Sequence, residues 1–215
     1  MTINLYLGDS LEAMRQMPDK CYDLAIVDPP YFKEYAKDGY QGNEISTTGV
    51  KRQNKLIKHW EIPNEEYFYE LQRVSKRQIV WGANYYAQYL PVGRIVWDKK
   101  NDNSTFSQAE IASISGYTKV FMFRYLWNGM LQEDMKNKEV RIHPTQKPIA
   151  LYRWCLEKFA KDGDRILDTH LGSGSIAIAC HDMGYDLDAW EIDPDYFNLA
   201  RDRLRTHQQQ LQLWS

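Results

Sequence analysis

The sequence repeats one pattern that limits the possible folds: a short apolar run that ends in a carboxylate or a glycine. Such runs, bounded by polar residues, are typical of buried strands. Where strands alternate with helical segments, they form a mostly parallel sheet, and the carboxyl ends of the strands meet at one ligand-binding edge. The expected strand ends are Asp9, Asp28, Gly82, Asp98, Asp168 and Glu191. We therefore predict an α/β fold with one site built from these positions.

The expected strands cover residues 3–7, 24–27, 78–81, 94–97, 119–125, 165–168 and 187–190. The expected helices cover residues 10–17, 64–74, 149–161, 175–183 and 195–205, with Asn64 as one N-cap. With 215 residues, 43% of them hydrophobic, the chain is expected to be a single domain, 1–215.

Composition excludes several classes of protein. The formal net charge is −2, so any nucleic-acid contact must use a local basic patch. No apolar run reaches the length of a membrane span, and the first residues lack the features of a signal peptide. Cys21, Cys155 and Cys180 lack metal-type spacing, so we expect reduced thiols, no metal site and a cytoplasmic location.

Asp28-Pro29-Pro30-Tyr31 follows directly after the apolar run 24–27. The two prolines have no N–H for a strand ladder, so they form a stiff turn at the carboxyl edge. The turn presents a carboxylate, backbone carbonyls with little freedom, and a flat ring. Hydrogen-bond acceptors beside a stacking ring suit a planar group that carries an NH₂, such as a nucleobase. The alternative is a surface turn in which Asp28 is only a local turn former.

A glycine-rich turn and an acidic residue make up a second candidate region. Gly172 and Gly174 let the backbone approach a ligand closely, and no Lys-Ser/Thr follows them, which argues against a phosphate-binding P-loop. Glu191 lies about twenty residues further on, an offset at which an acid commonly accepts hydrogen bonds from ribose hydroxyls. Ile192 beside it could cover one face of an adenine. The alternative for Glu191 is an exposed loop acid.

A third candidate region leads into the helix expected from residue 149: His143-Pro144-Thr145-Gln146-Lys147-Pro148. Two prolines three residues apart form a rigid lead-in. Helix N-termini attract anions, and Thr145 and Lys147 can reinforce this, so a carboxylate such as the methionine end of a cofactor would suit.

Three polar, irregular segments, about 32–63, 100–116 and 127–142, are expected to face the substrate. The first contains a basic stretch beside Trp60 that could track a phosphate backbone. Its cations are Lys51, Arg52, Lys55 and Lys58. The alternative is a solvated loop that happens to be basic. Tyr85 or Tyr86, after another strand, could wall a base pocket or pack in the core.

These motifs resemble those of the DNA amino-methyltransferases, in which Asp-Pro-Pro-Tyr is the catalytic motif and His-Pro-Thr-Gln-Lys-Pro closely matches a cofactor-binding motif. The family's glycine-rich motif usually reads Asp-Pro-Phe-x-Gly-Ser-Gly, and here Thr169-His170 replaces Pro-Phe. The order, with the catalytic turn early and the glycine-rich turn late, resembles the circularly permuted β group. The resemblance covers most of the chain and is weakest over residues 32–63 and 100–142.

The resemblance implies a doubly wound, seven-stranded methyltransferase fold, with the strand 119–125 as the antiparallel last strand. It implies S-adenosylmethionine as cofactor and Asp28, Pro29, Pro30 and Tyr31 as catalytic residues, with His170 packing against the cofactor in place of the family's residue. The implied cofactor contacts are Asp9, Ser10, His143, Thr145, Gln146, Lys147, Asp168, His170, Gly172, Ser173, Gly174, Ser175, Glu191 and Ile192. Asp9 can equally be a simple helix cap.

The implied reaction is methylation of adenine N6 in double-stranded DNA, in a bacterial or phage setting. The base must flip out of the duplex to reach the site, where Tyr31 would stack on it. Alternatives are cytosine N4, adenine in RNA, a non-catalytic binding module and a dinucleotide oxidoreductase. Because the substrate-facing segments are short, either the target is brief or a second subunit, in a homodimer, helps to read it. No feature of the sequence names a restriction endonuclease partner.

Overall fold

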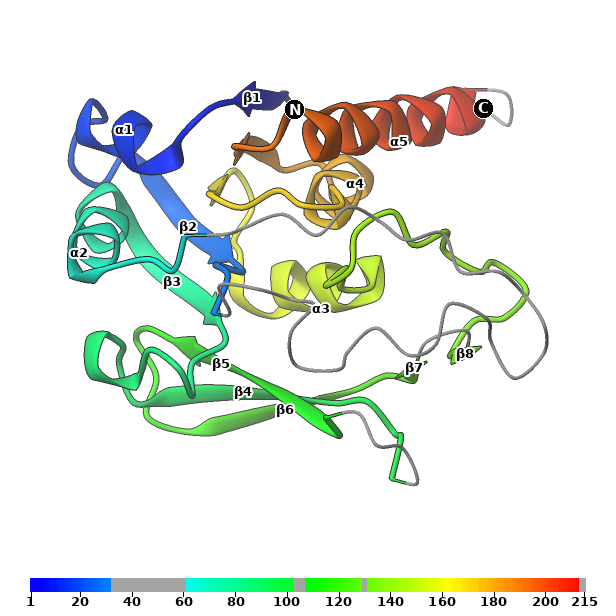
Figure 1. Cartoon of the computed structure of the whole chain (residues 1–215), viewed down its shortest axis with the longest axis horizontal. Coiled ribbons are helices and arrows are strands. Elements are labelled where there is room, and N and C mark those ends of the chain that lie inside the picture. Colours follow the sequence, from blue (N-terminus) through cyan, green and yellow to red (C-terminus); the bar gives the residue numbers. More distant parts are fainter. Residues whose placement is uncertain (32–60, 103–106, 129–130, 213–215) are drawn as a thin grey trace.

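An eight-stranded sheet forms the centre of the computed structural model, which describes residues 1–31, 61–102, 107–128 and 131–212 (Figure 1). The strand order is β1-β10-β9-β2-β3-β5-β4-β6. In that order the strands are Ile3–Leu7, Asp186–Glu191, Arg165–Asp168, Tyr22–Val27, Ser75–Trp81, Ala109–Ile114, Gly93–Asp98 and Val120–Arg124. The predicted mostly parallel α/β architecture is confirmed.

Every neighbouring pair in this sheet is parallel except the two pairs that β5 makes, with β3 and β4. The carboxyl ends of the parallel strands therefore lie at one edge of the sheet. Because β5 runs in the opposite direction, its amino end, at Ala109, lies at that same edge opposite Asp98. Parallel topology thus places the expected strand ends together. The antiparallel β5 brings its first residues, rather than its last, to the same edge.

Two predictions about the sheet are wrong. The described sheet has eight strands rather than seven, and the antiparallel strand is β5 rather than β6, which runs parallel to β4. We expected residues 100–116 to be irregular, yet β5 lies within them. Its sequence, Ala-Glu-Ile-Ala-Ser-Ile, combines small side chains with a charge and lacks the apolar run of a typical buried strand.

Helices cover both faces of the sheet, as Figure 1 shows for α1 and α2 on one side and α3, α4 and α5 on the other. They are α1 Ser10–Arg15, α2 Glu65–Val74, α3 Ile149–Phe159, α4 Ser175–Met183 and α5 Pro194–Gln212. Side chains on β2 alternate between the two cores: Leu24 and Ile26 pack toward α3 and α4, and Ala25 and Val27 toward α1 and α2. This two-sided burial explains the continuous apolar run before Asp28.

The remaining elements are short. A 3₁₀ turn, η1, covers Ala87–Tyr89, and β7 Trp127–Asn128 pairs with β8 Leu131–Gln132. The predicted cap of α2 is confirmed, since the Asn64 side chain accepts a hydrogen bond from the Tyr67 amide. Among the described helices, none combines the length and the apolar character needed to cross a membrane.

Candidate active site

A cavity of about 1270 Å³ lies at the carboxyl edge of the sheet. Four of the six predicted strand ends line it: Asp9, Asp28, Gly82 and Glu191. Asp98 and Asp168 do not, although Trp97, Lys99 and Thr169 beside them do. Pockets for single small ligands usually measure about 300–1,000 Å³, so this cavity has room for a nucleoside-sized cofactor and a second planar ligand.

The turn that follows β2 presents an unsatisfied acceptor. Asp28 Oδ2 accepts from the Lys147 ammonium at 2.5 Å, whereas Asp28 Oδ1 is buried and has no hydrogen-bond partner among the described residues. Burial raises the pKa of Asp28, and the charge of Lys147 opposes that rise. Buried acceptors without a partner are rare in native proteins. Because Asp28 lines the cavity, this oxygen is a candidate acceptor for an N–H or O–H that a ligand brings.

The two prolines of this turn are anchored in the core. Pro29 is buried, and the Pro30 carbonyl accepts a hydrogen bond from the hydroxyl of Tyr86. Tyr86 itself is 2% exposed, so it supports the turn from the core. Of the two tyrosines proposed to wall a base pocket, Tyr85 lines the cavity and Tyr86 does not.

Tyr31 presents its ring beside Asp28, stacked on Tyr85 with ring centroids 4.4 Å apart and planes only 4° from parallel. Gly82 makes this position possible. Its φ is +74°, and a Cβ added there would lie 2.7 Å from Cδ1 of Tyr31. The strand end that the sequence identified as Gly82 is therefore the place where the backbone makes room for the stacking ring.

Lys147, which we expected to contact the cofactor, lines the cavity, and its ammonium pairs with two carboxylates of the chain. Its side chain is 2% exposed and pairs with Asp28 Oδ2 and, at 2.9 Å, with Glu110 Oε2. The other oxygen of Glu110 pairs with Lys99 Nζ at 2.5 Å. Burial would raise the pKa of Glu110, but the two ammonium groups outweigh it and lower the pKa to about 2.

Glu191 connects the end of β10 to the glycine-rich turn. Its Oε2 accepts from the Gly172 amide at 2.8 Å and its Oε1 from the Asp193 amide at 2.9 Å. Burial raises the pKa of Glu191, and the backbone amides oppose the rise. The carboxylate is thus fixed at the cavity wall, with lone pairs left for hydroxyl donors. Ile192 beside it is 65% exposed and lines the same wall.

The glycine-rich turn divides its predicted residues between the cavity and the core. His170, Gly172 and Ser173 line the cavity, but Gly174 and Ser175 do not. Gly174, with φ +72°, would place a Cβ 3.2 Å from Cβ of Ala200, so this glycine serves the packing of α4 against α5.

Asp168 is buried, His170 is partly buried, and the surroundings favour the uncharged form of both. Asp168 Oδ1 accepts from the His170 amide at 3.0 Å, and burial raises the pKa of Asp168 to about 8. Burial lowers the pKa of His170 to about 4, so its imidazole is neutral at physiological pH. His170 lines the cavity and therefore offers it a flat, uncharged ring.

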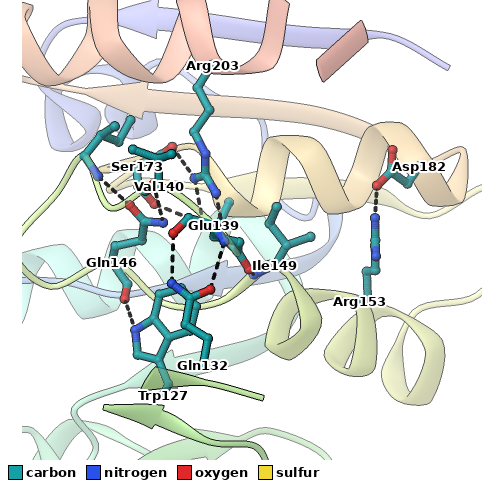
Figure 2. Close-up of polar contacts among 12 residues, drawn as sticks. Trp127, Gln132, Glu139, Val140, Gln146, Ile149, Arg153, Ser173, Asp182 and Arg203 are labelled. Atoms are coloured by element: carbon teal, nitrogen blue, oxygen red, sulfur yellow. Dashed lines mark hydrogen bonds and ion pairs between the residues drawn. The ribbon is translucent and has the colours of Figure 1, made fainter. Parts of the chain in front are cut away.

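The lead-in to α3 lies against the glycine-rich turn through His143, because a Cβ added at Gly172 would lie 3.7 Å from its ring. The ring centroid of His143 is also 4.3 Å from that of Tyr196 on α5. Thr145 Oγ1 lies 3.1 Å from His143 Nδ1. Gln146, in contrast, closes its own loop: it accepts from the Ile142 amide, donates to the Val140 carbonyl, and its backbone oxygen accepts from Trp127 (Figure 2).

The N-terminus of α3, which we expected to bind a ligand carboxylate, already holds a carboxylate of the chain. Glu139 Oε1 accepts from the Ile149 amide at 2.9 Å. Glu139 Oε2 pairs with Arg203 of α5 at 2.7 Å, and Arg203 also donates to the Ser173 carbonyl and to Ser175 Oγ (Figure 2). This Glu139–Arg203 pair connects the lead-in of α3 to the glycine-rich turn, and its two residues were not predicted.

Asp9 caps α1, since its Oδ1 accepts from the Leu11 amide at 2.7 Å, and both Asp9 and Ser10 line the cavity. Described residues of all three substrate-facing segments also reach the cavity, among them Ile62, Asn101 and Arg141. The predicted basic stretch lies outside the described residues: Lys51, Arg52, Lys55 and Lys58.

This geometry defines a class: an α/β domain with a ligand-sized cavity at the carboxyl edge of a mostly parallel sheet. Comparison with known proteins identifies the family. The DNA methylase family matches residues 94–202, half of the chain, and the chain belongs to this family.

Individual relatives agree over nearly the whole length. The type II methyltransferase M2.DpnII of Streptococcus pneumoniae is 27% identical over 92% of this chain and 87% of its own. M.HpaI of Haemophilus parainfluenzae, also a type II methyltransferase, is 22% identical over 95% of this chain and 74% of its own.

Solved structures share the fold at low sequence identity. M1.HpyAVI, crystallised with S-adenosylmethionine, superposes with a TM-score of 0.58 at 18% identity and covers 94% of this chain and 100% of its own. The cytosine-N4-specific PvuII DNA methyltransferase has a TM-score of 0.58 at 13% identity, covering 94% of this chain and 86% of its own.

Proposed function

We propose that this protein transfers a methyl group from S-adenosylmethionine to the exocyclic N6 amine of an adenine flipped out of double-stranded DNA. The observation that carries the proposal is the buried Asp28 Oδ1, an acceptor without a partner among the described residues, at the cavity beside Tyr31. An amine supplies the two N–H donors that this atom and the adjoining Pro29 carbonyl would accept. The proposal places the enzyme in the cytoplasm, with its DNA.

The residues of the cavity fit S-adenosylmethionine. Glu191 offers a carboxylate, fixed by two amides, for ribose hydroxyls, and the exposed Ile192 offers an apolar surface for a flat ring. Asp9 at the end of β1 supplies a further acceptor in the same cavity. When bound, the cofactor supplies an electrophilic methyl group. The His170 ring adds an uncharged wall.

The chain's own contribution is to prepare the amine. The lone pair of an adenine N6 is delocalised into the ring, so the nitrogen is a poor nucleophile. The Asp28 carboxylate and the Pro29 carbonyl would each accept one N–H, which draws the nitrogen toward a tetrahedral shape and localises its lone pair. Positioning and the match to developing charge account for most of such a gain.

Base flipping follows from the depth of the site. Asp28 is 14% exposed in its side chain and lies at the base of the turn, so a base within a duplex cannot reach it. The Tyr31 ring would stack on the flipped base, a contact worth about 1–3 kcal/mol.

Two observations bear on the choice of acceptor. Among proteins that the sequence resembles, Asp in the first position of the catalytic motif leans toward adenine, and Ser is commoner for cytosine N4. The fold neighbour PvuII methyltransferase is cytosine-N4-specific, so cytosine N4 is the second candidate. A nucleoside digest of the methylated DNA separates them, because N6-methyladenine and N4-methylcytosine differ in mass.

The test of the proposal is methyl transfer from labelled S-adenosylmethionine to unmethylated bacterial genomic DNA, with the wild type and Asp28→Ala. We expect label in N6-methyladenine for the wild type, and loss of transfer in Asp28→Ala with cofactor affinity, measured by calorimetry, close to wild type.

Asp23→Ala is the matched control. It removes a carboxylate from the same strand, but one that pairs with Lys76 at the opposite edge of the sheet and does not line the cavity. Near-normal transfer by Asp28→Ala would contradict the proposal. Label in N4-methylcytosine would show that the acceptor is cytosine N4, the second candidate. Label in RNA alone would exclude DNA as the acceptor.

A further inference from the structure

Four charged side chains form a chain of ion pairs behind the catalytic turn: Asp28, Lys147, Glu110 and Lys99. They come from four separate places, the ends of β2 and β4, the lead-in of α3 and the amino end of β5. Their side chains are between 2% and 22% exposed, and the two cations balance the two anions. The indole rings of Trp81 and Trp97 lie near the two ammonium groups.

The burial of these four charges requires a reason, because a buried ion pair seldom stabilises a protein more than apolar residues of the same volume would. The contacts of Asp28 suggest that the reason is functional. Lys147 engages Oδ2 and leaves Oδ1 as the acceptor without a described partner. Glu110 engages Lys147 from the other side, so the ammonium is shared between two carboxylates.

We propose that Lys147 and Glu110 are positioning residues: Lys147 fixes Asp28 with Oδ1 toward the base and keeps it ionised, and Glu110 limits how far Lys147 neutralises it. The inference rests on the proposed role of Asp28 as acceptor for the amine. It differs from the sequence-based expectation, in which Lys147 holds the carboxylate of the cofactor.

The two residues act on Asp28 with opposite sign. Lys147 lowers the pKa of the Asp28 carboxyl against the effect of burial, and Glu110 raises it. Among the described residues, Lys99 also acts on Asp28 and lowers its pKa. Asp168, on β9, also faces it. The neighbouring phenols are neutral, because burial raises the pKa of each; they are Tyr67, Tyr86 and Tyr152.

The first test measures Asp28 directly in the protein without ligands. The carboxyl carbon of Asp28 is titrated by NMR in protein labelled with ¹³C-aspartate, and the resonance is assigned by its loss in Asp28→Asn. Lys147→Met should raise the pKa of Asp28 by about one unit or more, the usual effect of removing a neighbouring opposite charge. Glu110→Gln should lower it.

The second test follows turnover. If ionised Asp28 is required, the acid limb of the kcat profile moves to higher pH in Lys147→Met and to lower pH in Glu110→Gln. Lys147→Arg, which keeps the charge, should leave the limb near its wild-type position. Should Lys147→Met fail to fold, the double variant Lys147→Met/Glu110→Gln removes the repulsion between the two carboxylates as well. Its Asp28 pKa should still exceed that of the wild type, because Lys147 acts on Asp28 more strongly than Glu110 does.

The third measurement separates positioning from cofactor binding. S-adenosylmethionine affinity should change less than threefold in Lys147→Met, whereas Glu191→Gln, at the ribose side of the site, should lose at least tenfold. Lys76→Met is the matched control, since it removes a lysine that pairs with Asp23 at 2.7 Å outside the cavity. It should change neither the Asp28 titration nor the pH profile.

The outcomes are distinct. A tenfold loss of cofactor affinity in Lys147→Met with an unchanged Asp28 pKa makes Lys147 a cofactor contact and overturns the inference. Shifts of the same direction in Lys147→Met and Glu110→Gln also overturn it. If the wild type does not methylate DNA, the proposed function fails, while the titration still decides whether Lys147 and Glu110 control Asp28.

Discussion

At the scale of single residues, the conformation of the Asp28–Tyr31 turn depends on neighbours that are distant in the sequence. Gly82 lies more than fifty positions after Tyr31, yet the absence of a side chain there allows the tyrosine ring to lie where it does. Tyr86, also more than fifty positions away in the sequence, donates a hydrogen bond to the Pro30 carbonyl. The sequence identified Gly82 as a strand end, and the structure gives the reason for a glycine.

Gly82→Ala should impair both stability and turnover. The positive φ costs about 1–2 kcal/mol for any residue with a Cβ, and the 2.7 Å approach to Tyr31 adds about 1–3 kcal/mol of overpacking or displaces the ring. Gly116→Ala is the control, because Gly116 has φ +78° and nothing within 4 Å of an added Cβ.

Denaturant unfolding and methyl transfer check this prediction. Both variants should lose the backbone contribution, and only Gly82→Ala should lose more stability and turnover, with cofactor affinity unchanged. Equal losses in the two variants, with full activity, would show that the Tyr31 ring does not need the space.

At the scale of elements, the site is assembled by contacts that no single segment specifies. The lead-in of α3 and the glycine-rich turn are about thirty residues apart, and Arg203 of α5 joins them through Glu139 and Ser173. Burial raises the pKa of Glu139 and lowers that of Arg203, and the pair opposes both changes. Breaking such a pair leaves an uncompensated buried charge.

Arg203→Gln should therefore destabilise the protein by about 3–5 kcal/mol and weaken cofactor binding, because the two segments that flank the cofactor site lose their connection. Arg153→Gln is the control. Arg153 pairs with Asp182 between α3 and α4, but its side chain is 49% exposed (Figure 2). Its loss should cost at most about 1 kcal/mol. Unfolding curves and calorimetry with S-adenosylmethionine give both quantities, and equal effects of the two substitutions would count against the connecting role of Arg203.

At the scale of the whole molecule, a protein with net charge −2 must bind DNA through a local concentration of cations. The sequence places one between the catalytic turn and α2, in residues outside the described part of the chain. Each lysine or arginine that neutralises a phosphate contributes about 0.9 to the slope of log K against log salt concentration.

Replacement of this basic stretch by alanine at Lys51, Arg52, Lys55 and Lys58 should weaken DNA binding and reduce that slope by up to about 3.6, with cofactor affinity unchanged. The control replaces four exposed cations of α3, its end and α5: Lys158, Lys161, Arg201 and Arg205. Fluorescence anisotropy over a series of salt concentrations measures the slope. An equal reduction in both sets would assign the effect to overall charge rather than to the stretch.

What the sequence determined by itself is what depends on short range: the strands and helices with strong apolar periodicity, the proline turn after Val27, the glycine-rich turn, and the rule that parallel strands end at one edge. That was sufficient to bring Asp9, Asp28, Gly82 and Glu191 to one cavity. Tertiary structure decided the rest. β5 is a strand only because β3 and β4 pair with it, and that pairing carries Glu110 to the active edge. Lys147 pairs with Asp28, and Glu139 occupies the N-terminus of α3, because folding brings these charges together from positions far apart in the sequence, which no local pattern records.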